Sequence, residues 1–72
     1  MYSETFPEKL KKARQDKNLI QVEVAERTKI PRSTLANYES GRTQPDLETL
    51  GILADFYEIS VDWLLGTKGG KK

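Results

Sequence analysis

The 72-residue chain contains no cysteine and no histidine. Without cysteine, it can form neither a disulfide bond nor a thiolate metal site. Without histidine, it lacks the commonest metal ligand and general base of proteins. It also lacks a pair of carboxylates at catalytic spacing and a glycine-rich phosphate loop. We therefore expect no metal site, no cofactor and no catalytic residue, and the composition argues against a small enzyme.

Long hydrophobic runs are missing too, because the longest apolar stretches span only a few residues. Such stretches are too short for a membrane span or for the apolar core of a signal peptide. The sequence therefore predicts a cytoplasmic protein that does not contact a membrane. Its length allows one domain only. A core this small must gain its stability from close helix packing, with help from a partner subunit where one binds.

The net charge of +1 hides a strong asymmetry along the chain. Residues 1–42 contain nine basic and six acidic side chains, whereas residues 43–66 contain five acidic side chains and no basic one. Three lysines follow in the last six residues. A basic front half suits a protein that presents one face to a polyanion such as DNA. The same asymmetry would suit head-to-tail self-association.

Apolar residues that recur every three or four positions predict an all-α chain of five helices. We expect one domain over residues 6–66 and a flexible basic tail over residues 67–72. The first helix begins at Phe6 and ends near Asn18, because asparagine tolerates the left-handed conformation that often ends a helix.

The fourth and fifth helices follow residues that can cap them. Asp46 and Ser60 each carry a side-chain oxygen that can accept a hydrogen bond from the first turn of the next helix. Gly66 is expected to end the fifth helix. The apolar positions of the fourth helix predict its buried face. They are Leu47, Leu50, Leu53, Ala54 and Tyr57.

The stretch from Gln21 to Gly41, QVEVAERTKIPRSTLANYESG, indicates two short helices joined by a tight corner. Val24, Leu35 and Tyr38 have the spacing of buried positions. The outward face of the second of these helices suits the reading of DNA bases, because arginine bonds guanine, asparagine bonds adenine and serine bonds either. An ordinary solvated helix face is the alternative interpretation. This face consists of Arg32, Ser33, Ala36 and Asn37.

Three segments in a fixed order cover almost the whole chain. They are EKLKKARQDKNLIQVEVA, PRSTLANYESGRTQPDLETL and LADFYEISVDWLLG. On these segments the chain resembles the lambda-repressor and Cro-type helix-turn-helix family, also called the xenobiotic-response-element type. The resemblance implies a five-helix domain with its helix-turn-helix motif at about residues 21–40. It also implies that the third helix enters the major groove of DNA.

The chain departs from the family pattern at the start of the second helix and at the corner. Ile20 stands where the family usually has a capping residue, and a missing cap costs about 1 kcal/mol. Lys29 stands where relatives commonly have glycine, and a lysine forced to a positive φ costs roughly 1–2 kcal/mol. Pro31 replaces a serine cap, but proline fits the start of a helix and makes Ile30 extended. These departures concern the geometry of the corner and not the presence of the motif.

The resemblance implies DNA contacts at several positions. Gln21 matches a glutamine that bonds a phosphate at the start of the second helix, and a surface glutamine is the alternative. Arg32, Ser33 and Asn37 match base-reading positions of the family. The remaining DNA-binding candidates, which would touch phosphate or sugar, are Thr34, Ser40, Arg42 and Thr43.

Two further sets of residues are expected to support these contacts. The resemblance places Arg14 opposite Glu39 as an ion pair that orients the third helix, and two unrelated surface charges are the alternative. An exposed apolar patch on the last two helices is the candidate dimer interface. Packing of the junction between these helices is the alternative interpretation. The candidate dimer residues are Ile52, Phe56 and Trp63, with Ile59 beside them.

These observations predict a sequence-specific transcriptional regulator that binds double-stranded DNA as a homodimer, on a palindromic operator. The pair Phe56–Tyr57 before VDWLLG resembles small repressors of prophages and mobile elements. The expected mechanism is therefore repression by operator occupancy. An antitoxin-like module that binds both DNA and a protein partner is the rival hypothesis, and an acidic surface on the last two helices that contacts a toxin would favour it.

Overall fold

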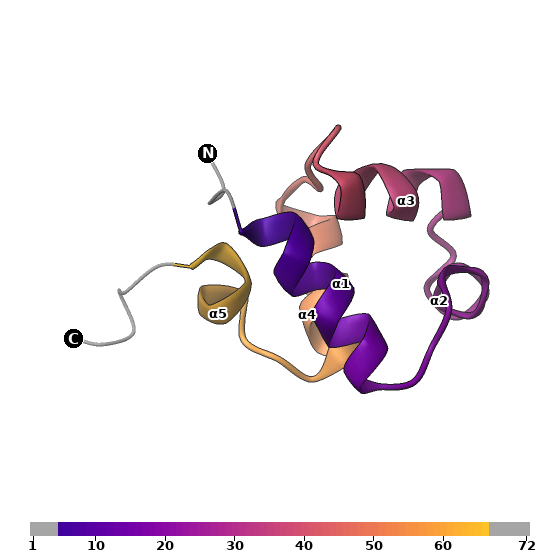
Figure 1. Cartoon of the computed structure of the whole chain (residues 1–72), viewed down its shortest axis with the longest axis horizontal. Helices are drawn as coiled ribbons and strands as arrows, with labels where there is room; N and C mark the ends of the chain where they lie inside the picture. The colour runs from indigo at the N-terminus through magenta and orange to yellow at the C-terminus, as the bar shows by residue number, and fades with distance from the viewer. Residues whose placement is uncertain (1–4, 67–72) are drawn as a thin grey trace.

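The computed structural model describes residues 5–66, and in this range it contains five α-helices and no strand. The predicted all-α fold class is confirmed, while the predicted tail at 67–72 lies outside the described residues. The helices are α1 (Phe6–Asp16), α2 (Gln21–Thr28), α3 (Arg32–Ser40), α4 (Leu47–Tyr57) and α5 (Val61–Leu65). Helix α1 packs against α3 and against α5, which lie on opposite sides of it (Figure 1).

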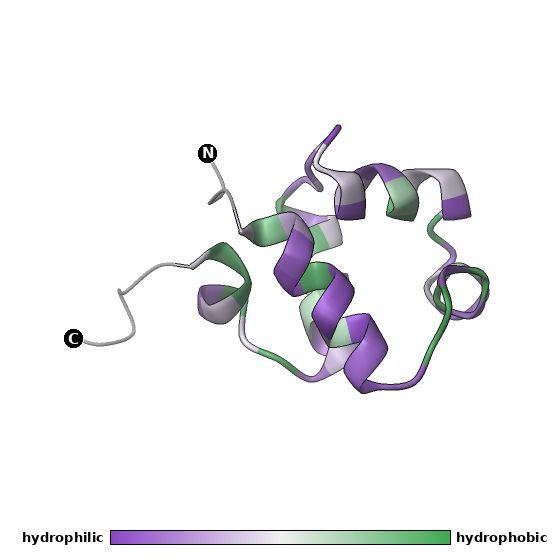
Figure 2. Cartoon of the chain, in the orientation of Figure 1, coloured by the Kyte–Doolittle hydropathy of each residue, from purple (hydrophilic) through white to green (hydrophobic). Residues whose placement is uncertain are grey.

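The core is built from one apolar face of each helix. Figure 2 shows hydrophobic segments turned inward on α1 and α4, and hydrophilic segments on the outer side of α1. Full burial of a leucine or phenylalanine side chain contributes about 1.5–3 kcal/mol, so these contacts are the main source of stability. The buried hydrophobic residues are Phe6, Leu10, Ala13, Val24, Ile30, Leu35, Tyr38, Leu50, Leu53, Ala54, Tyr57 and Leu64.

The prediction that Leu47 belongs to the core is wrong. Its side chain is 79% exposed, whereas Leu50, one turn later on the same helix, is fully buried. Leu47 is the first residue of α4. The buried face of α4 therefore begins at Leu50 and not at Leu47.

The predicted helix ends are found in the structure. The Asp46 carboxylate accepts a hydrogen bond from the Thr49 N–H at 2.9 Å, and the Ser60 hydroxyl accepts one from the Trp63 N–H at 3.0 Å. The hydrogen bonds from Thr49 lower the pKa of Asp46. After the C-terminal end of α1, Asn18 takes a left-handed φ of 59°, as its position in the sequence predicts.

Two lysines, one in α1 and one directly after it, contact the acidic half of the chain. The Lys17 ammonium lies 2.8 Å from the Glu58 carboxylate, and this contact lowers the pKa of Glu58. The Lys9 ammonium donates to the Trp63 carbonyl at 3.0 Å and lies 5.4 Å from the centre of the Trp63 ring. Part of the positive charge of the front half is therefore used to hold α4 and α5 against α1.

Candidate nucleic-acid interface

The corner between α2 and α3 has the geometry of a helix-turn-helix motif. Lys29 ends α2 in the left-handed conformation, with a φ of 67°. Pro31 precedes α3 with a ψ of 142°, which directs the chain into the new helix. Ile30 lies between these two residues in the sequence. Its side chain is buried in the core and so holds the corner in place. The positive φ expected at Lys29 is present although the residue is not glycine.

The start of α2 lacks a side-chain cap. Ile20 has no side-chain acceptor, so the only capping contact runs from its own backbone N–H to the Glu23 carboxylate at 2.9 Å. Within the described part of the chain, the backbone N–H groups of residues 21–23 have no acceptor. These N–H groups point along the helix axis at its positive end, where an anion is favoured.

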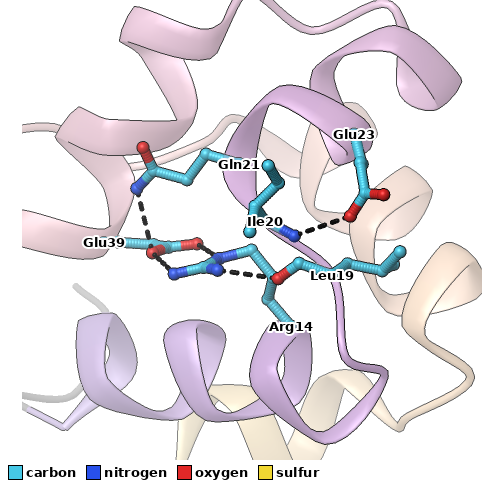
Figure 3. Close-up of polar contacts among 6 residues, drawn as sticks. All are labelled: Arg14, Leu19, Ile20, Gln21, Glu23 and Glu39. Atoms are coloured by element: carbon cyan, nitrogen blue, oxygen red, sulfur yellow. Dashed lines mark hydrogen bonds and ion pairs between the residues drawn. The ribbon is translucent and has the colours of Figure 1, made fainter.

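A buried ion pair joins α1 to the end of α3 (Figure 3). The Arg14 guanidinium donates to both oxygens of the Glu39 carboxylate, at 2.8 and 2.9 Å. A further Arg14 N–H donates to the Leu19 carbonyl at 2.8 Å. The side chains of Arg14 and Glu39 are only 11% and 5% exposed. The hydrogen bonds to Glu39 raise the pKa of Arg14 above its ordinary value.

Gln21 is part of the same network. Its side-chain amide nitrogen donates to the Glu39 carboxylate at 3.1 Å. This contact connects the first residue of α2 to the last turn of α3, and the resemblance to the family did not predict it. Since Arg14 and Gln21 both bond Glu39, three helices are held by one carboxylate.

The side chains expected to read bases lie on the outer face of α3. Arg32 and Ser33 are exposed, and Thr34 and Asn37 are half-buried. None of these four side chains makes a hydrogen bond or an ion pair to another residue in the described range 5–66. Their polar groups are therefore available to an external partner.

The end of α3 and the loop after it are held by hydrogen bonds to the carbonyl group of Asn37. The backbone N–H groups of Arg42 and Thr43 donate to this carbonyl at 2.9 and 3.4 Å, and the Ser40 hydroxyl donates to it at 3.2 Å. The side chains of Arg42 and Thr43 are exposed beside the end of α3. Gly41 has a φ of 83°, a conformation that side-chain-bearing residues rarely adopt, so glycine suits the end of α3.

Two shallow recesses flank Gln21. The first, of about 280 Å³, is lined by Gln21, Arg32 and Arg14 together with Ile20 and Val22. The second, of about 340 Å³, has a lining that includes Gln21, Ala36, Ser40 and Lys11. Lys11 was not among the site residues expected from the sequence. Lys11 lies three residues before Arg14 on α1, and residues three apart share a helix face. This spacing could have indicated that Lys11 lies beside Arg14.

The candidate dimer residues differ in exposure. Ile52 and Trp63 are exposed, at 42% and 38%. Phe56 is half-buried against the core and makes an edge-to-face contact with Tyr57, with ring centres 5.4 Å apart. Ile59 also packs against the core. The alternative interpretation, packing within the junction of α4 and α5, therefore describes Phe56 and Ile59.

One family model, described as helix-turn-helix, matches residues 10–64 of the chain. This match agrees with the five helices, the left-handed corner and the outward polar face of α3. The chain belongs to the lambda-repressor and Cro type of helix-turn-helix proteins. This helix-turn-helix chain is 43% identical over 58 residues to the transcriptional regulator ImmR of Bacillus subtilis, covering 81% of this chain and 46% of that protein. It is 37% identical over 60 residues to the transcriptional activator BcrR of Enterococcus faecalis, covering 83% of this chain and 29% of that protein.

A solved structure has the same helix-turn-helix fold. The crystal structure of a transcriptional regulator from Listeria innocua superimposes with a TM-score of 0.77 at 35% sequence identity, over 86% of this chain and 58% of that one. The chain spans less than half the length of the two curated relatives.

Among the helices described, none is long and apolar enough to cross a lipid bilayer. Residues 5–66 contain no cluster of acidic side chains that could hold a metal ion.

Proposed function

We propose that this helix-turn-helix chain is a sequence-specific DNA-binding domain of a transcriptional repressor, of the prophage or mobile-element type, that acts by occupying its operator. The observation that carries the proposal is the state of α3. The side chains of Arg32, Ser33, Thr34 and Asn37 make no hydrogen bonds to the described part of the protein, while the last turn of α3 is held by the buried pair of Arg14 and Glu39. A helix with free polar groups in a fixed orientation suits the major groove.

Base reading is assigned to Arg32, Ser33 and Asn37. The Arg32 guanidinium can donate two parallel hydrogen bonds to guanine, and the Asn37 amide can pair with adenine. The Ser33 hydroxyl can donate or accept and can serve either base. Arg32 is in the first turn of α3 and Asn37 lies five residues later, so the two side chains meet different base pairs.

Phosphate contacts are assigned to the groups that surround α3. The uncapped N–H groups at the start of α2 suit a phosphate oxygen, which would replace the missing cap. Gln21 can add the second N–H of its amide, since only one is needed for Glu39. Thr34, Ser40, Arg42 and Thr43 complete the proposed DNA-binding set, and Lys11 supplies positive charge on the same side. These contacts position the helix but do not select a sequence.

A homodimer on a palindromic operator follows from the size of the reading surface. One helix covers only a few base pairs, which is too few to select one operator from the competing sites of a genome. Two copies related by a two-fold axis would place their reading helices about 34 Å apart, one turn of DNA. The exposed residues Ile52 and Trp63, with the edge of Phe56, form the proposed interface. Because α4 and α5 are acidic, we expect a weak dimer that forms fully only on DNA.

The repressor role is supported by the simplicity of the mechanism. Occupancy requires only tight binding at the operator, whereas activation requires an additional surface that contacts the polymerase. The aromatic pair Phe56–Tyr57 before VDWLLG, typical of small prophage repressors, supports the same assignment. A reporter gene placed behind the operator should be silenced when the chain is expressed, and higher reporter expression would identify an activator instead.

The proposal is tested by selecting bound duplexes from a random pool and then footprinting the enriched sequence. We expect one palindromic motif to be enriched and protected. Affinity for it should fall steeply as salt rises, because phosphate contacts release counterions. Arg32→Ala should cost about 1–3 kcal/mol on the motif and relax the preference at one base pair, whereas Arg42→Ala should weaken binding to all sequences alike. Failure to enrich any motif, or affinity that does not change with salt, would refute the proposal.

A further inference from the structure

The corner between α2 and α3 holds a lysine in a conformation that disfavours it. Lys29 takes a φ of 67°, which glycine adopts freely and lysine adopts only at a cost in folding free energy. The corner cannot relax this φ, because the Lys29 N–H donates to the Ala25 carbonyl at 2.9 Å and the next residue, Ile30, is buried in the core. The backbone geometry therefore gives no reason for a lysine at this position.

The side chain of Lys29 makes no contact that would explain its presence. It is exposed, and within residues 5–66 its ammonium group has no hydrogen-bond or ion-pair partner. Glu26 lies only three positions earlier, yet the two side chains do not form an ion pair in the described structure. The charge of Lys29 is therefore available to an anion outside the protein.

Unpaired positive charge is concentrated at this corner. The basic side chains that bond another part of the protein are Lys9, Lys12, Arg14 and Lys17. Those without such a bond in the described range are Lys11, Arg27, Lys29, Arg32 and Arg42. Three of these five lie within residues 27–32, which join the end of α2 to the start of α3 and contain no acidic residue. The corner therefore presents a local positive charge that the net charge of the chain does not reveal.

We propose that Lys29 is a further DNA-binding residue, whose ammonium group contacts a backbone phosphate at the edge of the major groove that α3 enters. In a helix-turn-helix complex, the first helix of the motif crosses the DNA backbone and the start of the second helix enters the groove. Lys29 ends the first of these helices and precedes Arg32 by three residues, so their Cα atoms are at most roughly 11 Å apart.

A phosphate contact adds affinity for every DNA sequence and selects none. Lys29 thus lowers the stability of the fold and raises the affinity for DNA. This inference rests on the proposed function, because it assigns a role within the DNA complex.

Stability and binding are measured together to test the inference. Lys29→Gly removes both the charge and the strain, and Lys29→Asn removes the charge but keeps a residue that tolerates a positive φ. Lys29→Arg keeps the charge. The free energy of unfolding of each variant is measured in urea. Its affinity for the selected operator and for a random duplex is measured at several salt concentrations.

Lys12→Gln is the matched control, because it removes the same charge from another exposed lysine. Lys12 shares a face of α1 with Lys9, three residues earlier. Lys9 reaches Trp63 of α5, which lies on the side of α1 opposite to α3 (Figure 1). The control therefore changes the net charge equally but at a position away from the reading helix.

We expect Lys29→Gly to be at least as stable as the parent and yet to bind both duplexes more weakly. Since each phosphate contact contributes about 0.9 to the slope of log affinity against log salt, the slope should become shallower by about 1. The ratio of parent affinity to variant affinity should then shrink about threefold to fourfold as salt rises from about 50 to about 200 mM. Lys29→Asn should behave in the same way, Lys29→Arg should keep the slope of the parent, and Lys12→Gln should change it little.

An unchanged slope in Lys29→Gly would overturn the inference. An equal change of slope in Lys12→Gln would also overturn it, because the effect would then come from net charge alone. A larger loss on the operator than on the random duplex would show that Lys29 reads a base instead of a phosphate. If the parent enriches a motif and Lys29→Gly keeps its slope, only this inference fails, whereas a parent chain that binds no duplex refutes the proposed function as well.

Discussion

The buried ion pair of Arg14 and Glu39 gives a prediction about stability that does not depend on DNA. In Arg14→Met, the Glu39 carboxylate stays 5% exposed but loses both hydrogen bonds from the guanidinium, and only Gln21 remains as a donor. The Leu19 carbonyl loses its donor too. Removal of one partner from a buried pair costs about 3–5 kcal/mol. A domain of this size has a total stability of about 4–11 kcal/mol, so the variant should be largely destabilised.

The measurement is the free energy of unfolding in urea, followed by far-ultraviolet circular dichroism. Lys17→Met is the matched control, because the Lys17–Glu58 contact has the same 2.8 Å distance as the shortest Arg14–Glu39 contact but its side chains are 40% and 76% exposed. Its loss should be much smaller, since exposed pairs are weakened by water and salt. The comparison therefore separates the effect of burial from the effect of distance.

The double variant Arg14→Met with Glu39→Met completes the test. It removes both charges, so that no unpaired carboxylate remains in the core, and it should recover much of the stability lost in Arg14→Met. The reasoning is refuted if Arg14→Met costs no more than Lys17→Met. It is also refuted if the double variant is less stable than the sum of the two single changes predicts.

Three further changes test particular features of the fold. The Tyr57 hydroxyl is buried without a hydrogen-bond partner in the described structure, so Tyr57→Phe should be as stable as the parent or more so. Burial also raises the pKa of Tyr57 to about 12. Because the folded pKa lies above that of the unfolded chain, the parent should lose stability as the pH rises from 10 toward 12, and Tyr57→Phe should lose less over this range. Lys29→Gly should raise the free energy of unfolding by about 1 kcal/mol, since glycine accepts the φ of 67° without strain, and a loss of stability would show that the lysine side chain stabilises the corner. Ile52→Lys should leave the melting temperature unchanged and weaken operator binding by opposing the dimer, and unchanged binding would show that the two copies meet elsewhere.

The acidic half of the chain has a structural use as well as an effect on binding. Lys17 bonds Glu58 across 41 positions, and Lys9 reaches Trp63 across 54. Both contacts engage positive charge of the front half with the acidic half of the chain. We therefore expect the charge available to DNA to be smaller than the count of basic residues in the front half suggests.

The sequence by itself determined the helices and most of their ends. Periodic apolar positions, the caps at Asp46 and Ser60 and the terminators Asn18 and Gly66 act within a few residues. They therefore hold whatever the distant chain does. The positive φ at the corner was expected from the resemblance to the family, because relatives commonly have glycine where Lys29 stands. The family pattern also placed the polar face of α3 on the outside.

The resemblance to the family placed Arg14 opposite Glu39, and only the tertiary structure decided which other side chains meet across the chain. Leu47 matches the apolar period of α4 but is exposed, and periodicity carries no information about which turns of a helix other helices cover. The bond between Gln21 and Glu39 joins residues 18 positions apart. Local rules place both residues on helices but do not fix the distance between those helices. That distance depends on how α2 packs against α3. Together with the packing of α1 against α3, it determines that one buried carboxylate orients both Arg14 and Gln21.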